Sequence, residues 1–274
     1  MKTHMKKEVY DKVPQWIKEA KEEQYSIMVG DDIDSLTTAM LLRKVFGWQI
    51  NWFYDFDKVY VMDKENKRER IAVDMALEKN QKTIDNHVTL LKKGDKVNKN
   101  SINMNTMFEV SRENYTEKYA MSTLLTAWSL LGVPLPKTDE GKMLLLAIDS
   151  GYLGHYSTQF RPVHSEWLRM LGFDELIPFL ESKSPKDFKD TIKKYRLVGK
   201  ILIDTDGFLT HNGLDIEGIA KYLELEIELP KIKFELVYEL KRGNIKLASH
   251  NNSKHKDTYS FALIYNDKAC YTLL

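Results

Sequence analysis

The chain has very little cysteine, no long apolar run and no excess of charge of either sign. Cys270 is the only cysteine, which excludes an intramolecular disulfide and a zinc site built from several thiolates. The longest apolar run, Met143 to Ile148, is far shorter than the roughly 20 residues of a membrane-spanning helix. A net charge of +1 gives no general attraction to nucleic acid or to an anionic membrane. No apolar stretch follows the N-terminal lysines, so we expect no signal peptide, no membrane partner and a soluble cytoplasmic protein.

The remaining composition is that of a globular protein. Hydrophobic residues make up 43% of the chain and charged residues 30%, which excludes a disordered polypeptide. A length of 274 residues is comfortable for two domains. The sequence becomes more highly charged after Phe173, and we expect one domain over residues 1–185 and a smaller one over 186–274.

Apolar periodicity predicts an α/β fold. A strand at 25–29, an acidic turn, a helix at 35–46 and a strand at 49–54 together form the opening of a β–α–β unit. Further helices are expected at 9–23 (regular from about Pro14), 113–131, 139–148 and 214–223, and a loop at 92–105. Further strands are expected at 71–73, 83–84, 201–204, 232–240, 246–248 and 259–265. We therefore predict a mostly parallel sheet flanked by helices, followed by a smaller α+β domain.

Aspartates stand at the ends of these short apolar segments: Asp32, Asp34, Asp74, Asp85 and Asp149. Ligands bind where strands end in open α/β sheets, so these carboxylates are expected to converge. Two carboxylates about 5 Å apart repel by roughly 3 kcal/mol at an effective dielectric near 20, so a cluster needs cations or protons. An oxygen-rich set favours Mg²⁺ or Mn²⁺, and two such ions can clamp a phosphoryl group and activate a water. The structural alternative is that these residues are helix caps, turn residues and strand ends.

The same segments resemble the motifs of the DHH phosphoesterase superfamily, in its branch of RecJ-like nucleases and oligonucleotide phosphodiesterases. The matching segments, in the order and spacing of the four family motifs, are residues 27–41, 71–74, 84–88 and 145–151. The first resembles H-x3-D-x-D, and the third, Asp85-Asn86-His87, resembles D-H-H itself. The resemblance covers about residues 25–155.

The resemblance implies a site that holds one or two Mn²⁺ or Mg²⁺ ions. The implied ligands are Asp32, Asp34, Asp74, Asp149 and Asn86, with Asp74 bridging the two ions. His87 would face the substrate phosphate as a catalytic residue beside Asp74, and Asp85 would lie just outside the metal ligands. Two metal-binding histidines of the family are replaced, the first by Met28 and the second by Asn86.

Three interpretations follow. In the first, the protein is a divalent-metal-dependent phosphodiester hydrolase that acts on short oligonucleotides, single-stranded nucleic acid or a cyclic dinucleotide. In the second, loss of both imidazoles has left a DHH-like protein that binds a nucleotide or a protein partner without turnover. In the third, the chain is an interaction protein without metal, and its aspartates lie far apart. Retention of the carboxylates favours hydrolysis.

The C-terminal part is expected to bind substrate if the resemblance holds, although the family's G-G-G-H segment is missing. The nearest polar loop is residues 247–253, and Lys241-Arg242-Gly243 is expected to be a hairpin turn. A second hairpin turn is expected at residues 204–207. His155 is the best candidate to replace a lost imidazole. The aromatic residues of 48–54 are expected to lie in the core rather than to stack on a base.

Overall fold

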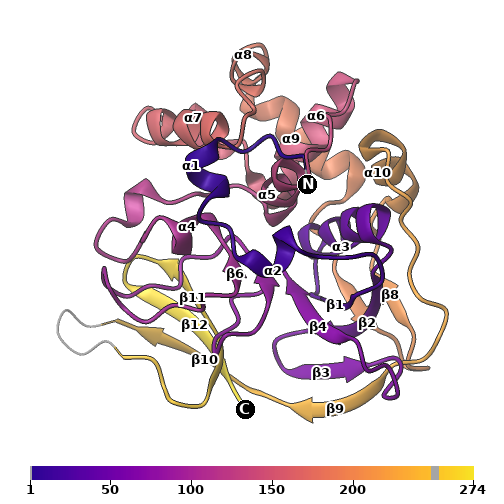
Figure 1. Cartoon of the computed structure of the whole chain (residues 1–274). Coiled ribbons are helices and arrows are strands. Elements are labelled where there is room, and N and C mark those ends of the chain that lie inside the picture. Colours follow the sequence, from indigo (N-terminus) through magenta and orange to yellow (C-terminus); the bar gives the residue numbers. More distant parts are fainter. Residues whose placement is uncertain (1, 248–252) are drawn as a thin grey trace.

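The computed structural model describes residues 2–247 and 253–274 and has a mixed α/β fold (Figure 1). The strands of the main sheet are β1 (Tyr25–Val29), β2 (Gln49–Tyr54), β3 (Lys58–Val61), β4 (Glu69–Val73), β5 (Thr83–Ile84), β6 (Ser101–Ile102) and β9 (Glu235–Glu239). They lie in the order β6-β5-β4-β1-β2-β3-β9. The pairs from β6 to β2 are parallel, whereas β3 and β9 are antiparallel additions. The predicted mostly parallel sheet is confirmed.

The first β–α–β unit brings the acidic turn to the end of the central strand. All of β1 is buried, as expected for a strand between two parallel neighbours. Helix α3 (Ile33–Phe46) begins after Asp32, whose carboxylate accepts a hydrogen bond from the Ser35 N–H at 3.0 Å. The helix ends at Gly47, which has a φ of 71°. The turn therefore lies at the carboxyl end of β1, where open α/β sheets bind ligands.

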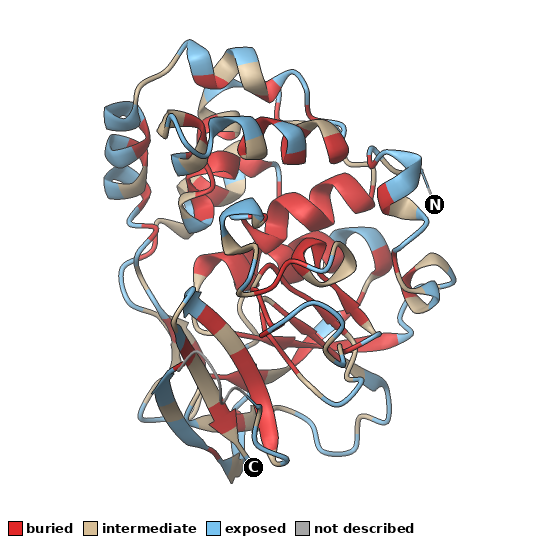
Figure 2. Ribbon diagram, turned by 90° about the vertical axis from the view of Figure 1, so that its left-hand side faces the viewer, coloured by how far each residue is buried: buried red, intermediate tan, exposed pale blue. Residues whose placement is uncertain are grey.

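Helices cover the sheet and extend beyond it. They are α1 (Lys7–Tyr10), α2 (Gln15–Lys18), α4 (Met104–Met107), α5 (Thr123–Leu130), α6 (Asp139–Ala147), α7 (Arg161–Met170), α8 (Leu176–Glu181), α9 (Pro185–Tyr195) and α10 (Ile216–Leu223). Short 3₁₀ segments are η1 (Tyr115–Glu117), η2 (Ile148–Ser150) and η3 (Leu153–Tyr156). Every residue of α5 is buried, and α5 packs against α3. The helices beside the sheet are almost wholly buried, whereas the outer helices present exposed faces (Figure 2).

A small antiparallel sheet stands on the side of the molecule opposite α6–α9 (Figure 1). It contains β10 (Lys241–Lys246), β11 (Thr258–Tyr265) and β12 (Lys268–Leu273), in the order β10-β12-β11. Strand β11 also bridges the N-terminal part of the chain, at Leu77–Ser260 and at Val88–Leu263. The C-terminal part thus contributes both this sheet and β9 of the main sheet. A division at residue 185 stays a prediction.

Two predicted helices are wrong in part. Residues 9–23 form the end of α1 and the separate α2, because Pro14 has no N–H and stands as the N-cap of α2. The helix predicted at 113–131 is confirmed only from Thr123. The segment before it is η1 and extended chain, held by hydrogen bonds between the backbone of Tyr119 and the side chain of Asn105.

Shorter expectations also have mixed outcomes. The predicted loop at 92–105 contains β6 and the start of α4. Gly243 lies within β10 rather than in a hairpin turn. The turn at residues 204–207 is confirmed, since it joins β7 (Ile201–Ile203) to β8 (Leu209–His211). Most of the polar loop at 247–253 lies outside the described residues.

Candidate functional site

Two of the predicted aspartates have an unusual backbone conformation. Asp74 directly follows β4 with a φ of 57°, and its N–H donates to the Ile84 carbonyl at 2.8 Å. Asp149 lies in η2, after α6, with a φ of 50°. Aspartate tolerates the left-handed region better than most residues, yet such positions still cost about 1 kcal/mol or more each. The direction of both side chains is therefore set by a strained backbone conformation, which the surrounding fold must stabilise.

Asp34 is buried at the N-terminus of α5. Its Oδ2 accepts a hydrogen bond from the Thr123 N–H at 2.7 Å, and its Oδ1 accepts one from the Leu124 N–H at 2.8 Å. The same Thr123 donates its hydroxyl to Asp74 Oδ1 at 2.8 Å. The partial positive charge of a helix N-terminus favours a carboxylate at this point. Helix α5 therefore anchors two aspartates that are 40 residues apart in sequence.

The carboxylates repel one another strongly. Burial, followed by the charges of Asp149 and Asp32, raises the pKa of Asp34 well above its ordinary value, although the α5 N–H groups lower it. Burial and the charges of Asp34 and Asp32 likewise raise the pKa of Asp74. The pKa of Asp149 is raised by burial and by Asp32, against the opposing effect of His87. These residues lie close together, as predicted, and their negative charge is only partly compensated by the protein.

His87 lies beside this cluster and lowers the pKa values of Asp74 and Asp149. Its Nδ1 donates to Asp85 Oδ1 at 2.6 Å, and the imidazole is 37% exposed. Burial lowers the pKa of His87, but the charge and hydrogen bond of Asp85, together with Asp74 and Asp149, raise it to about 10. Because Nδ1 is bound to Asp85, Nε2 is the ring nitrogen left to contact a ligand.

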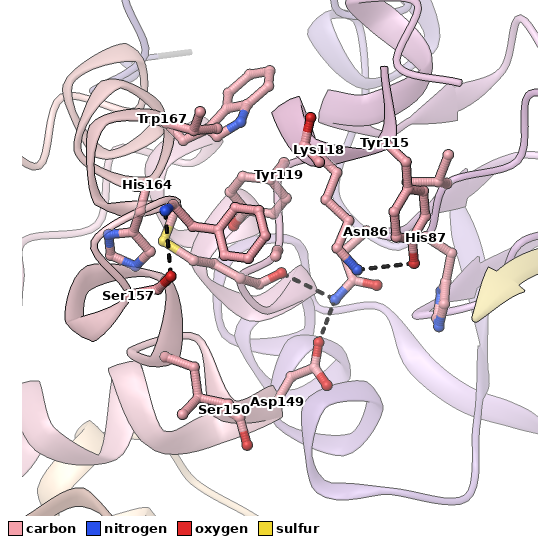
Figure 3. Close-up of a pocket in the computed structure, with 18 of the residues that line it drawn as sticks. Asn86, His87, Tyr115, Lys118, Tyr119, Asp149, Ser150, Ser157, His164 and Trp167 are labelled. Carbon is pink, nitrogen blue, oxygen red and sulfur yellow. Dashed lines mark hydrogen bonds between the residues drawn. The ribbon is translucent and has the colours of Figure 1, made fainter. Parts of the chain in front are cut away.

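Asn86 has its amide nitrogen directed at a carboxylate. Nδ2 donates to Asp149 Oδ2 at 2.8 Å and to the Met121 carbonyl at 3.0 Å (Figure 3). Because the Met121 carbonyl can only accept, the orientation of the amide is determined. In this orientation Asn86 holds Asp149 in place, and only the amide oxygen, on the other side of the group, is available to a cation.

The two other residues considered as imidazole positions, Met28 and His155, have their recorded contacts with other side chains. Met28 is completely buried in β1, and its sulfur accepts a weak contact from the Tyr259 hydroxyl at 3.8 Å. His155 is buried with its ring centroid 5.1 Å from that of Tyr156 and 6.1 Å from that of His164.

Buried asparagines form a support that the sequence analysis missed. Asn103 Nδ2 donates to Asp85 Oδ2 at 2.7 Å and to the His87 carbonyl at 2.8 Å. Asn105 Nδ2 donates to the Asn86 carbonyl at 2.7 Å. Both asparagines are fully buried, in a segment predicted to be a loop. The signal was their alternation with apolar residues at 102 and 104, which a solvated loop does not need.

Two cavities meet at His87. The smaller, of about 70 Å³, is lined by Asp32, Asp74 and His87, and by Ser260 and Cys270 of the C-terminal part. The larger, of about 620 Å³, begins at Asn86, His87 and Asp149 and runs toward α7 (Figure 3). His87 therefore borders both cavities, with Asp32 and Asp74 in the smaller one and Asp149 in the larger one.

The donor set fits a hard divalent cation. Across the described chain, Asp74, Asp85 and His87 form the one group of three potential ligands whose donor atoms all lie within 4.8 Å of one another. Asp32 and Asp149 add carboxylate oxygens nearby, as their effects on the pKa of Asp74 indicate. Oxygen-rich sets of this kind suit Mg²⁺ or Mn²⁺. Asp85 is the least available member, because His87 and Asn103 engage both of its oxygens.

Comparison with protein families, curated proteins and solved structures finds no match to this chain. Within residues 2–247 and 253–274, no helix combines the length and apolar character needed to cross a membrane.

Proposed function

We propose that the protein is a divalent-metal-dependent phosphodiester hydrolase of the DHH type, acting on a nucleotide or on single-stranded nucleic acid. One observation carries this proposal: three aspartates with raised pKa values converge beside His87, which is held by Asp85 and whose pKa is also raised. A neutral or cationic ligand would gain no favourable charge interaction from the histidine. A purely structural cluster would not require several carboxylates that repel one another.

The aspartates are the groups that would hold Mn²⁺ or Mg²⁺. Asp32, Asp74 and Asp149 offer oxygens, and each oxygen of Asp34 keeps a lone pair beyond its hydrogen bond to α5. When bound, such ions neutralise phosphate charge and lower the pKa of a water molecule. Their charge also removes the repulsion that raises the pKa values of the carboxylates.

The histidine would act on the phosphate. The His87 Nε2–H can donate to a non-bridging oxygen or supply the proton that the leaving oxygen takes. Asp85 holds Nδ1 and Asn103 holds Asp85, so the imidazole has one orientation and one tautomeric role. Asp85 is thus a positioning residue, and His87 is the group expected to touch the substrate.

The test is hydrolysis of short labelled oligonucleotides and cyclic dinucleotides with Mn²⁺ and with Mg²⁺. We expect turnover by the natural chain, and loss of that turnover in Asp74→Asn. If the natural chain binds metal but turns over none of these substrates, the proposal is overturned in favour of the second candidate.

That second candidate is a DHH-like protein that binds a nucleotide without turnover. Two observations favour it: Met28 is sealed in an apolar cluster, and Asn86 directs its amide nitrogen, rather than its oxygen, at Asp149. This candidate predicts that a nucleotide at 100 times its dissociation constant stabilises the protein by about 2.7 kcal/mol, which raises the melting temperature. The nucleotide should be recovered uncleaved.

A further inference from the structure

Thr123 is a buried threonine whose hydroxyl contacts a carboxylate of the site. It is the first residue of α5, and the N-cap of this helix is Ser122, whose hydroxyl accepts the Leu125 N–H at 3.1 Å. The Thr123 hydroxyl therefore has no part in capping α5. A threonine inside a helix commonly returns its hydroxyl to a backbone carbonyl of the preceding turn. Thr123 instead donates to Asp74 Oδ1 at 2.8 Å, across 49 positions of the sequence.

The position of this hydroxyl is fixed by the start of α5. The Thr123 N–H donates to Asp34 Oδ2 at 2.7 Å, and the Leu124 N–H donates to Asp34 Oδ1 at 2.8 Å. Thr123 and Leu124 are completely buried, and Asp34 is 3% exposed. Close packing leaves a buried side chain little freedom to change its rotamer, so the hydroxyl stays where it can reach Asp74.

The backbone at Asp74 is held by other groups. The Asp74 N–H donates to the Ile84 carbonyl at 2.8 Å, and the carbonyl of the preceding Val73 accepts the Ser35 hydroxyl at 2.9 Å. These bonds fix the point from which the Asp74 side chain starts, but they do not fix the direction of its carboxylate. Among the described residues, Thr123 is the one that donates a hydrogen bond to that carboxylate. The orientation of the carboxylate therefore depends on Thr123.

The two oxygens of Asp74 differ as a result. Oδ1 is held by the hydroxyl, whereas Oδ2 accepts no hydrogen bond from the part of the chain that the structure describes. Asp74 lines the smaller cavity together with Asp32 and His87. A cation in this cavity would meet Oδ2 without displacing a donor. It could bind both oxygens equally only if the carboxylate turned away from Thr123.

We propose that Thr123 is a positioning residue that presents Asp74 to a divalent cation through one oxygen, Oδ2, and so favours Mg²⁺ over Ca²⁺. The inference rests on the proposed function in that Asp74 is a metal ligand. Mg²⁺ is small and requires near-octahedral geometry, whereas Ca²⁺ is larger and takes more oxygens, including both oxygens of one carboxylate. A carboxylate that offers one oxygen suits Mg²⁺ and withholds a ligand from Ca²⁺.

Calorimetric titration with Mg²⁺ and with Ca²⁺ tests this without any substrate. Thr123→Val keeps the shape of the side chain and the backbone N–H to Asp34 but removes the hydroxyl. We expect it to weaken Mg²⁺ binding by about tenfold or more, the usual effect of removing a hydrogen bond to a metal ligand. Ca²⁺ binding should weaken by about threefold or less, because the released Oδ1 can also reach the larger ion. The ratio of the two affinities should therefore fall, and Thr123→Ser, which retains the hydroxyl, should restore it.

Thr38 provides a matched control. It is a completely buried threonine in α3, and its hydroxyl has no hydrogen-bond partner within the described chain. Thr38→Val makes the same chemical change as Thr123→Val, and it should leave the affinities for both ions unchanged. Melting temperatures in a chelating buffer show whether each variant is folded under the conditions of the titration.

The outcomes separate this inference from the proposed function. Unchanged affinities in Thr123→Val, or an equal loss of affinity for both ions, overturn the positioning role even if the natural chain hydrolyses oligonucleotides. A fall in the affinity ratio that Thr123→Ser restores supports the positioning role, and it does so even if no oligonucleotide or cyclic dinucleotide is hydrolysed, which overturns the hydrolase alone. A natural chain that binds neither Mg²⁺ nor Mn²⁺ overturns both.

Discussion

Replacing Asp74 by asparagine should stabilise the metal-free protein while abolishing its response to metal. Asparagine has nearly the same shape as aspartate, and its amide oxygen can still accept the Thr123 hydroxyl that lies 2.8 Å from Asp74 Oδ1. The substitution removes one negative charge from a cluster in which Asp34 and Asp32 raise the pKa of Asp74. The free energy of unfolding should therefore increase in the absence of metal.

The expected size follows from the repulsion. Two carboxylates about 7 Å apart repel by roughly 2 kcal/mol at an effective dielectric of about 20. For a chain of this length each kcal/mol raises the melting temperature by about 2–4 °C, so Asp74→Asn should melt some 4–8 °C higher in a chelating buffer at pH 7.5. The difference in melting temperature between Asp74→Asn and the natural chain should become smaller toward pH 5. An aspartate whose folded pKa is raised costs the folded state progressively more as pH rises from its unfolded pKa through the raised value.

In the presence of Mn²⁺, the natural chain should melt at a higher temperature than Asp74→Asn. Mn²⁺ at 100 times its dissociation constant should stabilise the natural chain by about 2.7 kcal/mol, whereas Asp74→Asn should show no such stabilisation. Thermal melts of both proteins in chelator and in Mn²⁺, at pH 5 and at pH 7.5, give the eight melting temperatures needed. Asp11→Asn is the control, since Asp11 is exposed and its carboxylate pairs with Lys7 at 2.5 Å on the surface; its effect should be within about 0.5 kcal/mol. A metal-free Asp74→Asn protein less stable than the natural chain would refute the reasoning.

Three further predictions concern the surroundings of the site. Asn103→Ala should lower the free energy of unfolding, measured in urea, by about 2–4 kcal/mol. The variant loses the N-cap of α4 and the hydrogen bond that Asn103 donates to the buried Asp85. A loss below about 1 kcal/mol would contradict this. Met28→His should destabilise by about 1–3 kcal/mol by burying an imidazole among apolar side chains, and calorimetry should find no tighter Mn²⁺ binding. His164 should contribute acid sensitivity: its folded pKa of about 4 lies below the usual 6.5, so stability is lost as pH falls from 6.5 to 4. The difference in melting temperature between the natural chain and His164→Gln should shrink over that range, and a constant difference would count against it.

Local pattern was enough to predict the parts of the fold that depend on near neighbours. Strand 49–54, strand 83–84 and the hairpin turn at 204–207 lie where predicted, because apolar runs and the Asp-Gly turn act over a few residues. The predicted helix at 113–131 failed over its first half for the opposite reason. Buried hydrogen bonds between Tyr119 and Asn105 outweigh the helical propensity of that segment.

The sequence by itself determined which residues make up the proposed site: aspartates at strand ends and one histidine two residues after an aspartate. Their convergence was foreseeable, because parallel strands end at one edge of a sheet. Only the tertiary structure decided how each group is held. Asp34 is bound by the N-terminus of α5, Asn86 turns its nitrogen to Asp149, and β11 closes one side of a cavity beside His87. These contacts join segments from 63 to more than 100 residues apart, and no periodicity in the sequence records which distant groups will meet.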